Sequence, residues 1–257
     1  MKKLLYSLFV VGTLFSASAQ EKLIVEYESR MEFDAEAFEK NVSVSGAQIA
    51  KQEVIDALKE SMKNPNYYTL RLTPSESEFK YIEKVSNEQP QEGRVKVKIV
   101  SGGTGVTYKN LNEKISLQSQ ESWNQNFLIK DSLKNYNWKI SKESKEILGY
   151  EVRKAEAKID SAQTAVAWYA PKLPYKNGPE NYQGLPGLIM EIEISDQSDE
   201  EKRKFIYKAI SVNVDSENKP IERPKKGKEI SAKEFEKLNK EQMEKMKEMY
   251  GGGVDKD

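Results

Sequence analysis

Two carboxylates have a spacing that acid–base or calcium chemistry could use. Glu191 and Glu193 alternate with Met190 and Ile192, so both leave one face of the same predicted strand, about 7 Å apart. Such a pair could bind calcium, or could act as the acid and base of a hydrolase of glycans or peptides. Glycosidase carboxylates, however, face each other across the scissile bond, which two groups on one strand face rarely do. A solvated strand face explains the pair better, and the hydrolase remains the alternative function.

Three short motifs could also carry chemistry. Ser77–Lys80 and Ser216–Lys219 match Ser-x-x-Lys, a nucleophile–base spacing that works from a helix. One lies in a predicted strand and the other precedes Pro220, so we interpret both as chance matches. The stretch Ser101–Gly105 lacks the Gly-Lys-Ser/Thr of a phosphate-binding loop. A hairpin turn is its simpler interpretation.

The chain of 257 residues contains no histidine and no cysteine. Neither a Ser-His-Asp nor a Cys-His triad can be built from it, and an ordinary zinc site is excluded. We therefore expect a protein that is not an enzyme, with no metal site and no cofactor. An exported protein without cysteine also cannot rely on disulfides, so its hydrophobic core must suffice.

The N-terminus has the three parts of a secretory signal peptide. Met1–Lys3 is basic, Leu4–Phe15 is apolar, and Ser16–Ala19 ends in Ala-x-Ala. The apolar run is shorter than the about 20 residues that span a bilayer. We predict cleavage after Ala19 and export to the periplasm or the outside. With no later apolar stretch and no cysteine for a lipid, we expect no membrane anchor.

Charge argues against a nucleic-acid partner. Cleavage removes Lys2 and Lys3 from 41 basic residues and none of the 41 acidic ones. The mature chain then has a small acidic surplus, whereas nucleic acids and anionic membranes attract a basic one.

Alternating apolar and polar residues predict most of the chain as antiparallel strands with one buried face. The clearest alternation covers Leu23–Tyr27, Val95–Ile99, Ile115–Leu117 and Leu188–Ile194. Further predicted strands are Tyr67–Thr73, Glu78–Val85, Gly105–Lys109, Asn126–Lys130, Asn137–Ser141, Ile147–Ile159, Thr164–Ala170 and Arg203–Val214. About ten strands joined by short turns tend to curl.

Two helices are predicted. Ala47–Lys63 has an apolar stripe and ends before Pro65, whereas Ser231–Tyr250 opens with a capping box, Ser231 to Glu234. Met243, Met246 and Met249 on the second helix could contact a partner or cover the sheet. The predicted organisation is a signal peptide (1–19), an antiparallel β domain with a helical insertion near 47–63 (20–214), a linker (215–230), a C-terminal helix (231–250) and a disordered tail (251–257).

The most distinctive segment runs from Trp168 to Ile189 and ends in Gly-Leu-Pro-Gly-Leu-Ile. Pro186 restricts its own φ and favours an extended Leu185, while glycine permits positive φ or close backbone approach. One interpretation is a rigid loop that leads into a strand and places Leu185 in the core. The other is a binding rim with contact aromatics. The candidate binding residues are Trp168, Tyr169, Pro171, Tyr175, Tyr182, Gly184, Leu185, Pro186, Gly187 and Leu188.

These residues resemble the signature of the GLPGLI family, exported envelope proteins of Gram-negative bacteria of unknown function. Trp138–Ile140, Gly149-Tyr150 and Lys154-Ala155 extend the resemblance over about residues 136–194. Many relatives have a cysteine shortly after the Gly-Tyr, where this chain has Val152-Arg153. More distantly, the chain resembles the periplasmic lipoprotein-carrier group. That likeness implies a strongly curved half-barrel whose concave face shelters an apolar ligand.

We therefore expect a mainly β (α+β) protein: a single strongly curved antiparallel sheet or half-barrel of about ten strands, with a packed helix and a C-terminal amphipathic helix. The expected function is that of an exported, non-enzymatic binding or accessory protein of the cell envelope. Its partner would be an apolar small molecule or lipid, or an outer-membrane or other envelope protein. The first partner requires a deep apolar cavity, and the second a filled core with an exposed aromatic patch.

Overall fold

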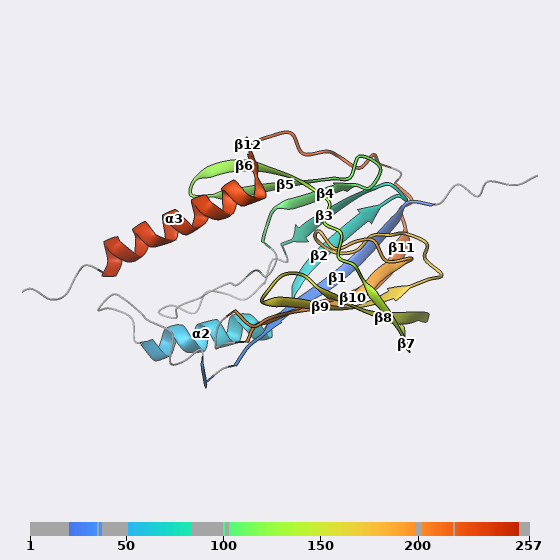
Figure 1. The fold of residues 1–257 in the computed structure, drawn as a ribbon, viewed down its shortest axis with the longest axis horizontal. Coiled ribbons are helices and arrows are strands. Elements are labelled where there is room, and N and C mark those ends of the chain that lie inside the picture. The colour runs from blue at the N-terminus through green and yellow to red at the C-terminus, as the bar shows by residue number, and fades with distance from the viewer. Residues whose placement is uncertain are drawn as a thin grey trace, which may run out of the picture.

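The structure of the protein is a computed structural model that describes residues 21–34, 36–37, 51–83, 100, 103–198, 202–217 and 219–251. These residues form one curved twelve-stranded sheet and two helices (Figure 1). The predicted fold class, mainly β with a single curved sheet, is confirmed. The strands are β1 (Leu23–Glu32), β2 (Asn66–Leu72), β3 (Glu76–Ile82), β4 (Val106–Asn110), β5 (Ile115–Ser122), β6 (Gln125–Ser132), β7 (Lys139–Ile147), β8 (Tyr150–Lys158), β9 (Gln163–Ala170), β10 (Leu188–Asp196), β11 (Lys204–Val214) and β12 (Lys228–Ser231).

The strand order is β12-β6-β5-β4-β3-β2-β1-β11-β10-β9-β8-β7. All neighbours pair antiparallel except β12 and β6, which are parallel. The first strand β1 lies near the middle, between β2 and β11. Two meanders therefore extend from β1, with β2 to β6 on one side and β11 back to β7 on the other.

Two of the predicted strands needed correction. Ile147–Ile159 is not one strand, because Leu148 and Gly149 form a turn with φ of 51° and 78° between β7 and β8. The predicted strand Asn137–Ser141 is only the beginning of β7, which continues to Ile147. The predicted strand Val95–Ile99, the first two residues of the predicted turn at 101–105, the signal peptide and the predicted tail from residue 252 onward lie outside the described residues.

The segment predicted as a linker, 215–230, packs on the sheet. Ile221 lies against an apolar cluster on the convex face, made of Tyr108, Leu117 and Leu128. Arg223 adds a 3.1 Å ion pair with Glu113. The segment then ends in β12, whose parallel pairing with β6 continues the sheet.

Helix α2 (Lys51–Lys63) ends before Pro65 as predicted, contacts β1 and buries Ile55. Helix α3 (Ala232–Gly251) begins with the predicted capping box. There the Ser231 backbone NH donates to the Glu234 carboxylate at 3.0 Å, and the Glu234 NH donates to the Ser231 hydroxyl at 3.2 Å. Phe235 packs edge-to-face on Phe127 of β6, with ring centroids 5.2 Å apart. The C-terminal end of α3 projects beyond the strands (Figure 1).

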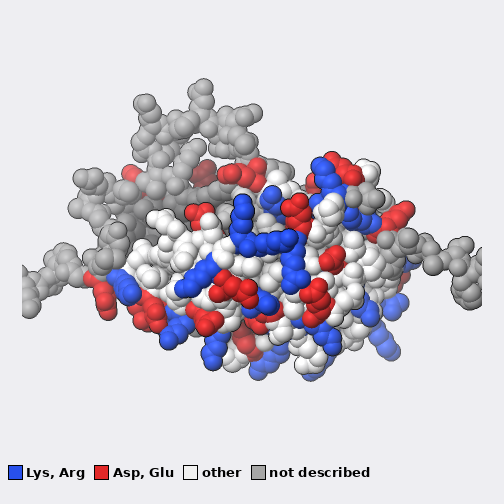
Figure 2. Space-filling view, turned by 90° about the horizontal axis from the view of Figure 1, so that it is seen from above, with Lys and Arg blue, Asp and Glu red and all other residues white. Residues whose placement is uncertain are grey.

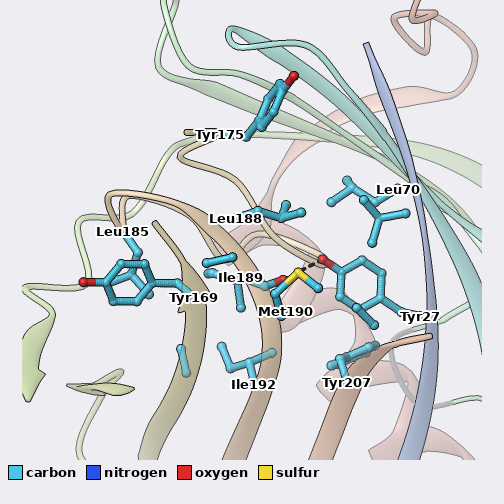
Figure 3. Close-up of a cluster of buried hydrophobic side chains, with 14 of the residues drawn as sticks. Tyr27, Leu70, Tyr169, Tyr175, Leu185, Leu188, Ile189, Met190, Ile192 and Tyr207 are labelled. Carbon is cyan, nitrogen blue, oxygen red and sulfur yellow. Dashed lines mark hydrogen bonds between the residues drawn. The ribbon is translucent and has the colours of Figure 1, made fainter. Parts of the chain in front are cut away.

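The main core lies on the concave face. It joins inward-facing residues of β1, β2, β9, β10 and β11 to residues 173–190, and Figure 3 shows its centre. Basic and acidic side chains are interspersed over the face that Figure 2 shows, with no large area of one sign. The apolar groups of the motif segment thus belong to the interior of the sheet.

Candidate functional site

The loop between β9 and β10, residues 171–187, folds into the concave face of the sheet, and we call it the plug. Leu185 is 1% exposed, and Tyr175 and Leu188 are buried in the same core cluster. Gly184 and Pro186 face solvent. This arrangement is the structural interpretation of the motif, a loop that leads into a strand and places Leu185 in the core.

Many backbone groups of the plug form hydrogen bonds within the plug or with the beginning of β10. Leu173 accepts hydrogen bonds from the NH groups of Tyr175 and Leu188, at 2.7 and 2.9 Å. Asn177 accepts one from Ile189 at 3.0 Å and forms an isolated antiparallel bridge with Gln183. Because these bonds replace water inside the sheet, a buried loop of this length costs little in unpaired polar groups.

Side chains from distant parts of the chain hold the plug and the beginning of β10 in place. Tyr27 of β1 donates to the Ile189 carbonyl at 2.6 Å, which Figure 3 marks with a dashed line. Trp138 donates its indole NH to the Gln183 carbonyl at 2.9 Å. Ser116 of β5 donates its hydroxyl to the Asn181 side chain at 2.7 Å. The plug is thus tied to both halves of the sheet.

The two glycines of the six-residue run are needed for different reasons. Gly184 has a φ of 96°, in the left-handed region, and open space around its Cα. Gly187 packs against the backbone of Ala170 on β9, where a Cβ would lie 2.7 Å from the carbonyl carbon. The first glycine permits the turn and the second permits close approach of two strands.

Of the four aromatic side chains predicted as contacts, two are buried and two are half-buried. Tyr169 and Tyr175 are buried, as are Leu185 and Leu188. Trp168 is half-buried beneath the Lys145 ammonium, 4.3 Å from its ring centroid. Tyr182 is half-buried against Tyr136, with centroids 5.3 Å apart. Of the remaining candidates, Pro171 is half-buried, Gly184 and Pro186 are exposed, and Gly187 is buried.

Lys109 is a buried cation beneath the plug. Its side chain is 0% exposed on the inward face of β4. The ammonium donates to the carbonyls of Gly178 and Tyr182, at 2.8 and 3.0 Å. Burial lowers the pKa of Lys109 from 10.5 to about 7, and the charge of Glu180 acts in the opposite direction. Lys109 therefore holds the middle of the plug through two hydrogen bonds, and removing its charge from water costs free energy.

Glu180 is the acidic counterpart. Its backbone has a φ of 46°, a conformation that non-glycine residues adopt rarely. The Tyr207 hydroxyl of β11 donates to its carboxylate. Burial raises the pKa of Glu180, while this hydrogen bond and the charge of Lys109 act to lower it. Cavities that contain such perturbed groups are candidate functional sites.

Lys109 and Tyr207 also show how strongly the sheet curves. They lie on β4 and β11, with β3, β2 and β1 between them. In a flat sheet the two strands would be about 19 Å apart, four spacings of about 4.8 Å. Both side chains nevertheless reach the five residues 178–182 of the plug. The sheet must therefore wrap around the plug.

A cavity of about 190 Å³ opens beside Glu180, between the plug and the beginning of α3. Inward-facing residues of β5 and β6 form its floor, and the loop 133–136 forms one side. Its lining includes Ser116, Gln118, Ile129, Asp131, Tyr136, Ile159, Gln163, Glu180, Asn181, Tyr182 and Ala232. A larger depression of about 530 Å³ at the β6–β12 edge is open to solvent. There Lys130 and Glu229 pair with each other at 3.3 Å, so we place the candidate site in the smaller cavity.

The carboxylate pair of β10 lies outside this cavity. Glu191 pairs with Lys145 at 2.6 Å, and Glu193 with Lys204 at 3.2 Å. Ser77 and Lys80 leave opposite faces of β3, since only residues two apart share a strand face. The described part of the chain contains no group of three or more acidic side chains that could hold a metal ion. None of its helices is long and apolar enough to cross a bilayer.

The class defined by fold and site is an open, mainly antiparallel half-barrel whose concave face holds a loop of the chain itself. Residues 156–191, from β8 through the plug to β10, match the family model described as "Protein of unknown function (Porph_ging)". This match supports a family of unknown function and falls on the segment that carries the predicted GLPGLI signature. No curated protein sequence matches the chain.

Two solved structures of one protein share the fold. PNGF-II, in its C2 and P21 crystal forms, is similar with TM-scores of 0.50 and 0.51 and 17% identity, over 85% of this chain. The chain spans about a third of PNGF-II, 32% and 33% in the two forms. An uncharacterized conserved protein from Thermus thermophilus is similar at a TM-score of 0.38 and 8% identity, over 82% of this chain and 91% of that one. At these identities the likeness to PNGF-II concerns the fold alone.

Sequence reasoning missed Lys109, Glu180 and Tyr207 as parts of the site. No local signal identifies Lys109, because the alternation of Val106 and Tyr108 with Thr107 and Lys109 assigns Lys109 to the polar face of its strand, whereas both faces are buried in the structure. Glu180 lies inside the motif segment, but nothing local separates it from a surface carboxylate. Tyr207 reaches it only because β11 and the plug meet across the concave face.

Proposed function

We propose that the protein is an exported, non-enzymatic accessory protein of the cell envelope, which docks onto another envelope protein at the mouth of the Glu180 cavity. This proposal retains the predicted binding role and selects one of its two versions. The supporting observation is that the chain's own plug fills the concave face.

The apolar-carrier version is less well supported. A carrier of this fold would need its concave face free for the ligand, and at that place the core contains Leu185, Leu188 and Ile189 instead. The cavity that remains has about 190 Å³, below the about 300–1,000 Å³ of small-molecule pockets. Its lining also mixes amide, hydroxyl and carboxylate groups with apolar ones. A lipid would have to displace the plug, together with the hydrogen bonds that hold it.

The hydrolase alternative has no specific observation in its favour. Both of its candidate carboxylates, Glu191 and Glu193, are engaged by lysines on the outer face. Glu180 has the environment of a perturbed acid, but its neighbours are the phenol of Tyr207 and an ammonium that is bound to carbonyls. We therefore keep binding as the proposal.

Native mass spectrometry separates docking from carriage. The chain from Gln20 onward is purified from the envelope of cells that express it, and is measured before and after organic extraction. Docking predicts the bare protein mass in both samples. An extractable adduct of a few hundred daltons would overturn the docking version and restore the apolar-ligand carrier.

Site-specific photocrosslinking then tests the docking site. A photoreactive amino acid replaces Asp131, which is exposed beside the cavity. The matched control replaces Glu151, which is exposed on β8 away from the cavity. Docking predicts one discrete crosslinked envelope protein from position 131 and none from position 151. Equal labelling from both positions, or none from either, contradicts docking at the cavity mouth.

A further inference from the structure

The inner wall of the cavity carries one carboxylate without a cationic partner in contact. Glu180 receives a hydrogen bond from Tyr207. Among the described residues, no lysine or arginine lies within 4 Å of it to form an ion pair, and the ammonium of nearby Lys109 donates instead to the carbonyls of Gly178 and Tyr182. Glu180 is half-buried, and a carboxylate that is largely removed from water and paired with neutral donors retains part of its desolvation cost. A cation that entered the cavity would relieve that cost.

Aromatic faces stand beside this carboxylate. Tyr136 and Tyr182 both line the cavity, and their rings are 5.3 Å apart at an angle of 34°. Tyr136 is held in place because its hydroxyl donates to the Asn181 carbonyl at 3.3 Å. The electron-rich face of an aromatic ring attracts ammonium and guanidinium groups, and more strongly where water is excluded. Carboxylate and rings therefore favour the same kind of ligand.

Charges at the mouth do not oppose this preference. Asp131 and Lys134 both line the opening and are exposed, one of each sign. Tyr68 and Tyr207 face Glu180 from the sheet, and burial raises the pKa of both phenols. They are therefore neutral at ordinary pH. The charge of Lys109 interacts with Glu180 and partly offsets it, but Lys109 is not among the residues that line the cavity.

The volume of the cavity limits the size of the group that it can bind. A volume of about 190 Å³ is below the about 300–1,000 Å³ of pockets that enclose whole drug-sized molecules. It suits one small group on a chain rather than a large ring system. Gln118 and Asn181 in the lining add amide groups for hydrogen bonds.

We propose that the cavity beside Glu180 binds a single alkylammonium or alkylguanidinium group, held between the carboxylate and the rings of Tyr136 and Tyr182. In the proposed docking role, this group is a lysine or arginine side chain of the partner, so the inference deepens that role. The site itself can be tested without a partner. Failure here would leave the crosslinking result standing, and failure of crosslinking would leave this site standing.

The test uses three probes of similar shape on the purified protein at pH 8: Nα-acetyl-lysine amide, Nα-acetyl-arginine amide and the neutral Nα-acetyl-norleucine amide. Binding is followed by NMR shifts of the amides of residues 131–136 and 180–184. We expect at least one cationic probe to bind tenfold or more tightly than norleucine amide. Equal shifts from all three probes would overturn the proposal.

Two variants connect the binding to the site. Glu180→Gln keeps the shape of the side chain and should weaken the cationic probe at least tenfold. The matched control, Glu193→Gln, removes a carboxylate that Lys204 engages on β10 and should leave the affinity unchanged. Retained affinity in Glu180→Gln would refute the assignment.

A third variant keeps the test decisive if Glu180→Gln fails to fold. Asp131→Lys changes an exposed residue at the mouth and is not expected to disturb the core. It places a competing ammonium at the opening, so it should weaken the cationic probe severalfold and leave the norleucine probe unaffected. Unchanged binding of the cationic probe would count against this cavity as its site.

A free amine and a partner side chain would present the same group, and the probes distinguish them. Butylammonium is compared with Nα-acetyl-lysine amide under the same conditions. Similar affinities indicate a site for free small amines, and a preference for the peptide-like probe indicates a partner's side chain. Both results support the cation site, and an absence of binding by every cation overturns it.

Discussion

The hydroxyl of Tyr27 donates a 2.6 Å hydrogen bond to the backbone carbonyl of Ile189, 162 positions further along the chain. Tyr27 belongs to the first strand, and Ile189 closes the Gly-Leu-Pro-Gly-Leu-Ile run. The bond is buried and joins the centre of the sheet to the beginning of β10, just after the plug (Figure 3). The motif therefore depends on a residue that lies far outside it.

Tyr27→Phe tests this bond. The substitution keeps the ring in the core but leaves the buried Ile189 carbonyl without its donor, so it should lower the free energy of unfolding by about 1–2 kcal/mol. Urea denaturation measures the change. Tyr150→Phe, at a half-buried position at the beginning of β8, is the control and should cost less than about 0.5 kcal/mol. Equal effects would mean that the hydrogen bond contributes nothing specific.

Gly187→Ala and Gly184→Ala should differ sharply. At 187 a methyl group would press on the backbone of Ala170, and neither strand can yield, so we expect a loss of about 3 kcal/mol or more. At 184 the nearest atom is 4.0 Å away, and only the cost of a positive φ remains, about 1 kcal/mol. Thermal unfolding of both variants gives the ranking. The reverse ranking would refute the close packing of plug and β9.

Buried ionisable groups predict a maximum of stability at alkaline pH. The pKa of Lys109 falls from 10.5 to about 7 on burial, so between these values the unfolded chain binds more protons than the folded one. Stability from this group should therefore rise with pH from about 7, by at most about 1.4 kcal/mol per pH unit. Burial raises the pKa of Tyr27 and Tyr182 above the ordinary value of 10.0. Above pH 10 the unfolded chain loses protons that the folded chain keeps, so stability should fall.

Lys109→Met tests whether Lys109 causes the rise of stability above pH 7, separately from the fall above pH 10. Urea midpoints are measured at pH 7, 8.5, 10 and 11 for the variant and the unchanged protein. The variant also loses two hydrogen bonds, which lowers its stability at every pH, so the comparison uses the change of the midpoint with pH and not its absolute value. Among groups that face Lys109, Glu180 has a raised pKa. Its stabilising contribution is present at acidic pH and is lost as pH rises through its raised pKa, so it opposes the rise expected from Lys109 and does not produce it. The variant should lose the rise between pH 7 and 10 and keep the fall above 10. An unchanged rise would show that Lys109 does not titrate in that window.

Phe235→Ala tests how α3 is held. The ring packs on Phe127 beside Leu238, and no other aromatic contact joins α3 to β6 in the described residues. Its loss should release the helix locally and increase hydrogen exchange over residues 232–251, while β1 and β2 remain protected. Met243→Ala removes a side chain that is 52% exposed and should leave exchange of the first helical turns unchanged. Loss of protection throughout the sheet would contradict a locally docked helix.

Local patterns were enough to predict most elements. Alternation in Leu23–Tyr27 and Leu188–Ile194 marks β1 and β10, because each strand has one buried face. The capping box of α3 and the proline after α2 depend on contacts within a few residues. The turn at Leu148-Gly149 escaped prediction because apolar alternation continues on both sides of it. Leu148 is also not a residue that usually adopts positive φ.

The tertiary structure decided everything that depends on contacts between distant segments. The pairing of β12 with β6 joins residues about a hundred positions apart, and its four-residue strand has no pattern of its own. The inward position of Lys109, the environment of Glu180 and the burial of Tyr169 and Tyr175 follow from a sheet that wraps around the plug. The sequence by itself determined most of the strands, the two helices and the restricted backbone of the Gly-Leu-Pro-Gly-Leu-Ile run, because those are local properties of the backbone. Whether that turn faces a partner or the core was decided by the curvature of the sheet, which no short segment encodes.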